Sequence, residues 1–163
     1  MGRPVTIRPA TREDYPAVCA LLDQLDAMHC EALPRVFRHP QPPARSREYV
    51  ESILADEEAT LLLAESGGEA VGLAHAAIRR SRDIPALVPR RFAVVDDLVV
   101  APGWQGRGVG RALMEAVEAW AGERGASDVE LTVWEFNRQA AAFYQALDYR
   151  VASRRMWKPL DDA

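Results

Sequence analysis

The sequence predicts an α/β fold in which about six or seven strands form a mixed central sheet with about four helices, in the order β-α-α-β-β-β-α-β-α-β. Apolar residues recur at helical spacing near the N-terminus and again over residues 109–123. Between these stretches, short β-branched runs are separated by glycine and proline. A glycine-rich turn then joins the predicted strand 92–100 to the helix 109–123, which is typical of a β-α-β unit.

Length and composition favour one ordinary folded domain over residues 1–163. The chain has 163 residues, of which 48% are hydrophobic and 27% charged, close to the average of globular proteins. The formal net charge is −4, whereas general nucleic-acid binding needs a surplus of Lys and Arg. Nucleic acid is therefore not an expected partner.

The chain carries no pattern of a membrane protein or a metal protein. Its N-terminus lacks the apolar stretch of a signal peptide, and no run approaches the roughly 20 apolar residues that span a bilayer, so we expect a cytoplasmic protein without a membrane partner. Cys19 and Cys30 have no C-x-x-C spacing, and we expect two reduced thiols. His29, His39 and His75 are dispersed, so no metal is expected.

The N-terminal third predicts a strand, a helix, a loop and a second helix. A β-branched stretch over residues 5–9 predicts the strand, and Thr11 caps a helix over residues 13–29. Four prolines over residues 33–44 exclude regular helix there, and Ser46 caps the second helix. The two helices and the loop are expected to form a flap over the core.

The middle and C-terminal parts predict the rest of the sheet. Residues 59–65 and 70–78 flank Gly67-Gly68 and predict an antiparallel hairpin, because these glycines can adopt the positive φ of a tight turn. Residues 79–91 hold five arginines and one aspartate and predict a long connection, for which a solvated basic loop is the simplest interpretation. The further elements expected are a strand over 92–100, a helix over 109–123, a strand over 129–134, a helix from Asn137 to Leu147 and a closing strand over 151–157.

The turn Gln105-Gly106-Arg107-Gly108-Val109-Gly110 is a candidate phosphate site. Unpaired backbone N–H groups and the dipole at a helix start favour an anion, and glycine lets the backbone approach phosphate oxygens. Arg107 and Arg111 add positive charge. A dinucleotide fingerprint needs Gly or Ala where Arg111 stands, and a P-loop needs Lys and Ser or Thr where Val109 and Gly110 stand. Both of those signatures fail.

The remaining pattern, Q-x-x-G-x-G, resembles the pyrophosphate-binding motif of the GCN5-related N-acetyltransferase (GNAT) family. The preceding Asp97–Pro102 is similar to the family's strand-to-loop signature. The downstream segment Leu131–Asn137, with Ala140 or Ala141, Phe143 and Tyr144, resembles its L-x-V-x-x-x-N-x-x-A-x-x-F-Y pattern. The motifs cover about residues 92–157, and Asp148-Tyr149 departs from the family's usual Gly-Phe. Asp tolerates the left-handed conformation, so the helix can still end there.

The resemblance implies an N-acetyltransferase that moves an acetyl group from acetyl-CoA to a primary amine of a small molecule or a protein, by direct attack in a ternary complex. It implies that pantetheine pairs with the backbone of the strand bearing Leu98, Val99 and Val100. A catalytically silent acyl-CoA-binding sensor is the alternative. The coenzyme-binding residues that it implies are Leu98, Val99, Val100, Gln105, Gly106, Arg107, Gly108, Val109, Gly110, Arg111, Asn137, Ala141 and Tyr144.

Acyl transfer also needs a neutral amine, a stabilised oxyanion and a proton for the thiolate. The resemblance implies that Tyr144 is the acid and Asp96 the base, directly or through water, and Val100 N–H is an oxyanion donor. Asp96 and Asp97 point to opposite faces of a regular strand, so at most one faces the cleft unless a bulge intervenes. Asn137 as a plain helix cap and Tyr144 as a packing residue are the simpler roles.

The acceptor is left open between a polyamine, an aminoglycoside, an amino acid and a protein N-terminus. Its contacts are expected from the flap, residues about 27–49, and from the arginine-rich connection, which could instead hold the coenzyme's 3′-phosphate. A homodimer is also left open.

Overall fold

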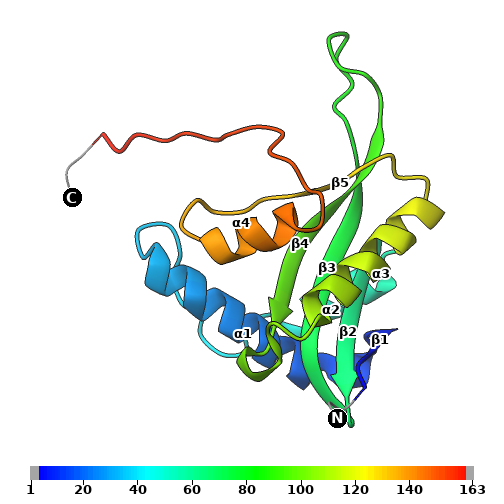
Figure 1. Cartoon of the computed structure of the whole chain (residues 1–163), viewed down its shortest axis with the longest axis vertical. Helices are drawn as coiled ribbons and strands as arrows, with labels where there is room; N and C mark the ends of the chain where they lie inside the picture. The colour runs from blue at the N-terminus through cyan, green and yellow to red at the C-terminus, as the bar shows by residue number, and fades with distance from the viewer. Residues whose placement is uncertain (1–3, 161–163) are drawn as a thin grey trace. The chain divides into compact units, whose positions relative to one another are not determined.

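The computed structural model describes residues 4–160 and groups the chain into two compact units, one ending at Thr132 and the other beginning at Val133 (Figure 1). Short 3-10 turns occupy Arg12–Asp14 and Pro102–Trp104. The second unit contains one helix, α4 (Arg138–Gln145). The elements of the first unit are β1 (Thr6–Pro9), α1 (Tyr15–Ala32), α2 (Arg47–Ala55), β2 (Ala59–Ser66), β3 (Glu69–Arg80), β4 (Arg91–Val100), α3 (Val109–Glu123) and β5 (Val129–Leu131).

The first unit is built on one sheet with the strand order β1-β2-β3-β4-β5. Strands β1 to β4 pair antiparallel, and β4 pairs with β5 in parallel. The predicted hairpin is confirmed: Gly67 and Gly68 join β2 to β3 with φ angles of 60° and 82°. The mixed α/β sheet is therefore the one that the sequence predicts.

Helices cover both faces of this sheet, because neighbouring strand residues point to opposite sides. On one face, Leu63, Leu73 and Val99 join Val18 of α1 and Val50 of α2 in one buried cluster. On the other face, a Cβ added to Gly72 would lie 3.1 Å from the Leu113 side chain and 3.2 Å from that of Val109, both on α3. The sheet is thus packed between α1 and α2 on one side and α3 on the other (Figure 1).

A β-bulge interrupts the pairing of β3 with β4. His75 lies opposite Asp97, but Ala76 lies opposite Val95, so Asp96 is an extra residue with no partner in this register. A bulge of this kind re-aims the side chains beside it. Asp96 and Asp97 therefore do not follow the alternation of a regular strand.

Local signals in the flap act as the sequence predicts. The Ser46 Oγ accepts a hydrogen bond from the Tyr49 N–H at 3.1 Å and starts α2. Residues 33–44, with their four prolines, contain no regular helix or strand. The Tyr15 hydroxyl donates to the Arg45 carbonyl at 2.7 Å and ties the end of this loop to α1.

One predicted strand is missing and another is shorter than expected, so residues 4–160 contain five strands rather than six or seven. Strand β5 ends at Leu131, because the backbone turns ahead of α4, where Asn137 N–H donates to the Trp134 carbonyl at 2.8 Å. Residues 151–157 form no strand within residues 4–160. Their order V-A-S-R-R-M-W places two arginines in succession, so neither face of such a strand would be uniformly apolar.

An ion-pair cluster anchors β1 to the start of α1. The Arg8 guanidinium donates to both Asp14 carboxylate oxygens at 2.7 and 2.8 Å and to Glu65 at 2.8 Å. Asp14 also accepts from the Thr11 N–H at 2.8 Å. The hydrogen bond from Arg8 is the main reason why the pKa of Asp14 lies well below that of an ordinary carboxyl group.

We expect Asp14→Asn to lower the free energy of unfolding by about 1–2 kcal/mol at pH 7. Loss of the capping hydrogen bond from the Thr11 N–H accounts for about 1 kcal/mol, and loss of the solvent-screened ion pair with Arg8 for less. Since the folded-state pKa of Asp14 is depressed, its contribution is present above the ordinary carboxyl pKa of about 3.9 and is lost as the pH falls below it. Urea unfolding at pH 7 and pH 3 measures this. A gap that is equally large at both values would contradict it.

Candidate active site

A cleft of about 460 Å³ opens on the α2 side of the sheet. Strands β3 and β4 contribute its floor, and α2 with the preceding loop contributes one wall. All of its lining residues belong to the first unit. They are Arg45, Tyr49, Ser52, Ile53, Asp56, Ala59, His75, Ala77, Arg79, Asp96 and Asp97.

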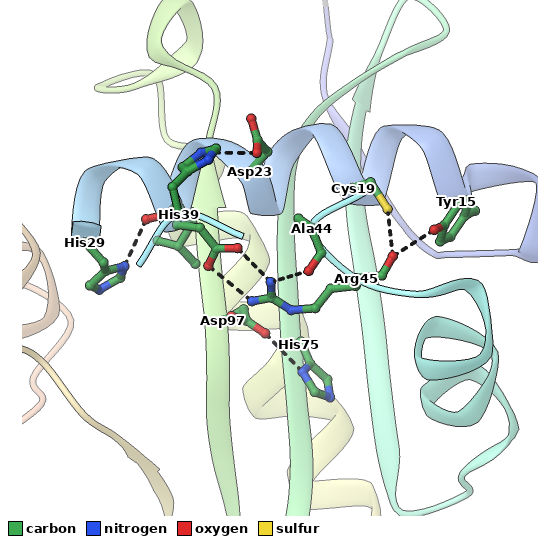
Figure 2. A network of polar contacts seen from close by, with 11 residues as sticks. Tyr15, Cys19, Asp23, His29, His39, Ala44, Arg45, His75 and Asp97 are labelled. Atoms are coloured by element: carbon green, nitrogen blue, oxygen red, sulfur yellow. Dashed lines mark hydrogen bonds and ion pairs between the residues drawn. The ribbon is translucent and has the colours of Figure 1, made fainter. Parts of the chain in front are cut away.

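His75 and Asp97 form a hydrogen-bonded pair on the floor of this cleft (Figure 2). The His75 Nδ1 lies 3.2 Å from the Asp97 Oδ2, and His75 is only 6% exposed. No hydrogen bond involves its other ring nitrogen, Nε2, and among residues 4–160 no buried side-chain nitrogen or oxygen lacks a partner. Nε2 therefore meets solvent.

The bulge brings Asp96 into the same cleft as Asp97. Both aspartates line it, although adjacent residues of a regular strand would face opposite ways. The Asp96 carboxylate lies 3.7 Å from the Arg79 guanidinium, and its side chain is 37% exposed. The cleft therefore holds both of these carboxylates, whereas a regular strand would have placed only one of them there.

Arg45 and Tyr49 form the upper part of the cleft. The Arg45 guanidinium donates to Asp26 at 2.7 and 3.2 Å, and this hydrogen bonding raises its pKa (Figure 2). Burial raises the pKa of Tyr49, and the negative charge of Asp97 adds to that rise. At neutral pH, Arg45 is therefore a cation already paired outside the cleft, and Tyr49 keeps its phenolic proton.

Carboxylates outnumber cations in the lining. Asp56, Asp96 and Asp97 face only two guanidinium groups, Arg45 and Arg79, and the charge of Arg45 is shared with Asp26. An excess of negative charge in a cleft attracts cations. The cleft is thus suited to a positively charged guest such as an ammonium group.

The glycine-rich turn has the shape of an anion cradle. Gly106 and Gly108 have φ angles of 72° and 82°, and no atom lies within 4 Å of the place where a Cβ would stand at either residue. Helix α3 begins at Val109, and the N–H groups of a first helical turn have no partners within the helix. The Gln105 side chain donates to the Val100 carbonyl at 3.1 Å and ties the turn to the end of β4.

The second half of β4, which leads into this turn, has no neighbouring strand on the side of β5. Strand β5 pairs only with Ala93–Val95, and within residues 4–160 no other strand follows it along Asp96–Val100. The predicted coenzyme residues Leu98, Val99 and Val100 lie on this stretch. Its backbone can therefore pair with an extended ligand, as peptides do at open sheet edges.

The second unit holds the other predicted site residues. The Asn137 Oδ1 accepts a hydrogen bond from the Ala140 N–H at 3.0 Å, so Asn137 does cap α4, the helix that carries Ala141. Burial raises the pKa of Tyr144 to about 12. After α4, Asp148 adopts a φ of 66°, in agreement with the expectation that Asp can end this segment.

The arginine-rich connection is engaged mainly in surface ion pairs. Arg80 and Arg91 contact Glu58 at 2.9 and 3.0 Å, and Arg90 contacts Asp128 and Glu130 at 3.2 and 2.6 Å. A cavity of about 670 Å³ is lined entirely by residues 80–91 of this connection, from which acceptor contacts or a 3′-phosphate site were expected. The contacts favour the simpler interpretation of a solvated basic loop.

Sequence reasoning missed His75 as a site residue, whereas Arg45 and Tyr49 lie in the flap, residues about 27–49, from which acceptor contacts were expected. The one available signal was a single histidine inside the apolar run 70–78, which is also the pattern of a core histidine. Within residues 4–160 the structure shows neither a cluster of three or more His, Cys, Asp or Glu side chains placed for a metal ion nor a helix of the length and apolarity that a bilayer requires.

The structure thus combines a mixed α/β sheet, a polar cleft and a glycine-rich turn of the shape that suits an anion. The chain belongs to the acetyltransferase (GNAT) family, whose model matches residues 22–149. The fold and the family of N-acetyltransferases expected from the sequence are thereby confirmed.

One curated relative and two solved structures are similar to this chain. Aminoglycoside N(6')-acetyltransferase type 1 of Stenotrophomonas maltophilia is 28% identical over 146 residues, which cover 90% of this chain and 89% of the relative. A crystal structure of a mutant BH1408 protein from Bacillus halodurans superposes with a TM-score of 0.90 at 26% identity, covering 95% of this chain and 99% of that one. AAC(6')-Iy, in complex with the bisubstrate analog CoA-S-monomethyl-acetylneamine, shares the fold with a TM-score of 0.77 at 22% identity, covering 97% and 99%.

We expect Gly108→Ala to destabilise the protein by about 1–2 kcal/mol, because a φ of 82° forces a side chain into the left-handed region. Gly122→Ala is the matched control: it lies near the end of the same helix without a positive φ or a close neighbour, and should stabilise by about 0.4–1 kcal/mol. Urea unfolding of both variants measures the difference. Equal effects of the two changes would contradict this conformational requirement.

Proposed function

We propose that this protein transfers the acetyl group of acetyl-CoA to the primary amine of a small molecule, by direct attack in a ternary complex. The observation that carries the proposal is the open edge of β4 running directly into a glycine turn at the start of α3. Membership of the GNAT family supports a coenzyme A donor. The bisubstrate complex of the structural relative AAC(6')-Iy is consistent with that donor.

The donor residues divide between the two parts of coenzyme A. The backbone of Leu98, Val99 and Val100 pairs with the pantetheine arm, and the family resemblance also assigns Asn137 and Ala141 to coenzyme binding. Main-chain N–H groups of the glycine-rich turn and two cations, Arg107 and Arg111, hold the diphosphate. The residues assigned to this site are Gln105, Gly106, Arg107, Gly108, Val109, Gly110 and Arg111. Open space at Gly106 and Gly108 supports this assignment, because side chains there would fill it.

The acceptor side favours a small, positively charged amine. Three carboxylates line the cleft, and they would hold an ammonium group in place. The relative from Stenotrophomonas maltophilia is named for acetylating an aminoglycoside, a polycationic amine. An aminoglycoside is therefore the first acceptor to test, followed by a polyamine and an α-amino acid ester.

The chemistry then needs three groups. The Val100 N–H stabilises the oxyanion that forms when the amine nitrogen attacks the thioester carbonyl. Tyr144 donates its proton or a hydrogen bond to the departing thiolate, and its raised pKa keeps the phenol protonated at neutral pH. The amine must also lose a proton before attack, and the cleft offers Asp96 and the His75–Asp97 pair for this step.

We expect wild-type protein to bind acetyl-CoA in a calorimeter and to release thiol when an acceptor amine is added. Tyr144→Phe should lower kcat by about 10- to 100-fold, since one proton donor is lost, while acetyl-CoA affinity changes less than about threefold. Tyr149→Phe, a change of the same kind at a ring 5.7 Å from that of Tyr144, is the control and should keep wild-type kcat.

The outcomes separate an enzyme from a sensor. Binding of acetyl-CoA without thiol release from any amine would replace the enzyme by a coenzyme-binding sensor. No heat with acetyl-CoA at millimolar concentration would exclude both.

A further inference from the structure

We propose that the His75–Asp97 pair is the base that deprotonates the acceptor amine, with His75 as the catalytic residue and Asp97 as its positioning residue. This inference rests on the proposed acetyl transfer and names its proton acceptor. It starts from the contact between the His75 Nδ1 and the Asp97 Oδ2 at 3.2 Å, inside the cleft.

The contact with Asp97 decides which ring nitrogen is basic. A carboxylate can only accept, so the neutral His75 ring places its proton on Nδ1 and leaves the lone pair on Nε2. That nitrogen meets solvent, as shown above. The arrangement is the one that a base needs: a fixed ring, a defined tautomer and a lone pair open to the substrate.

The bulge separates the roles of the two neighbouring aspartates. Asp97 lies opposite His75 in the strand register and holds its ring, whereas Asp96 is the extra residue and faces Arg79 at 3.7 Å. An ordinary imidazole titrates near neutral pH and an ordinary carboxyl near pH 4, and a general base works best when its pKa is close to the working pH. We assign Asp96 to holding the acceptor's ammonium group.

Titratable and charged groups from several elements line the cleft around His75. Strand β4 contributes Asp96 and Asp97, whereas the neighbour of His75 on β2 is the apolar Leu61. The others are Arg79 on β3, Arg45 in the loop before α2, Tyr49 on α2 and Asp56 after α2. Their net formal charge is negative, which favours a cationic acceptor beside the ring.

The step balances as follows. The ammonium R–NH₃⁺ gives one proton to the His75 Nε2 and becomes R–NH₂. Its nitrogen attacks the thioester carbonyl carbon, forming the N–C bond, and the C–S bond then breaks. The nitrogen loses its second proton as the thiolate becomes a thiol, and His75 returns its proton to solvent through the cleft.

The test compares kcat/KM of thiol release for wild type and His75→Asn over pH 6.5–9. The asparagine amide keeps a donor toward Asp97 but has no basic nitrogen. With an aminoglycoside or polyamine acceptor of amine pKa near 10, we expect a loss of about 100- to 1,000-fold at pH 7. The kcat/KM of the variant should rise about tenfold per pH unit, because the fraction of neutral amine rises at that rate, whereas the kcat/KM of the wild type levels off. The difference between the two proteins therefore becomes small at high pH.

Acceptor basicity gives a second readout that a purely structural role would not change. An α-amine of pKa near 7.8 is neutral in roughly one of seven molecules at pH 7, against about one in 2,500 for an amine near 10.4. His75→Asn should therefore cost less than about tenfold with an α-amino acid ester. An equal loss with both acceptors would overturn the proposal.

The aspartates supply matched variants. Asp97→Asn should lower kcat/KM by about 10- to 100-fold with the pH profile of His75→Asn, because the ring loses its anchor. Asp96→Asn should raise KM for a polycationic acceptor about tenfold and change kcat less than about threefold. Asp128→Asn, an exposed carboxylate paired with Arg90 outside the cleft, should match the wild type.

Two failures are distinguishable. The wild type could turn over while His75→Asn keeps its rate within about threefold, with wild-type urea unfolding and acetyl-CoA affinity. That result overturns the assignment of His75 and keeps the proposed function. If His75→Asn does not fold, His75→Gln takes its place in the same assays. Absence of thiol release by the wild type with every amine overturns the proposed function and this inference together.

Discussion

The pairing of β3 with β4 is the constraint on which the candidate site depends. Its register places His75 opposite Asp97, and its one bulge leaves Asp96 without a partner on β3. A regular ladder would send Asp96 to the α3 side, where the sheet is packed against an apolar helix and a charge would be costly. The bulge keeps both carboxylates on the side of the cleft and sets His75 against one of them.

The same strand joins the proposed acceptor and donor regions of the first unit. Its middle forms the cleft floor, its free edge follows at Asp96–Val100, and its end leads into the glycine turn. Gln105 bonds the turn back to the Val100 carbonyl, so the start of α3 is held at the end of this edge. An acyl group presented along the edge would therefore lie on the same strand as an amine held in the cleft, and such proximity is what acyl transfer needs.

Most polar groups around the cleft have a partner, and this limits what each group can do. Arg45 is bonded to Asp26, and its own carbonyl accepts from Tyr15 on α1 (Figure 2). Asp97 is bonded to His75, and Asp96 faces Arg79. The His75 Nε2 is the basic atom of this set that is bound to no side chain, and buried networks of this kind fix the orientation of their members.

The sequence by itself determined most of the elements and the glycine-rich motif, because these depend on local chemistry. Proline, glycine and capping signals placed α2 at Ser46 and the hairpin at Gly67-Gly68, and the spacing of Val109, Leu113 and Val117 gave the bounds of α3. Only the tertiary structure decided the acceptor cleft: His75 and Asp97 are 22 residues apart, and a strand register and one bulge bring them together. Register is set by packing across the whole sheet, so no local pattern around Asp96 could show which way it faces.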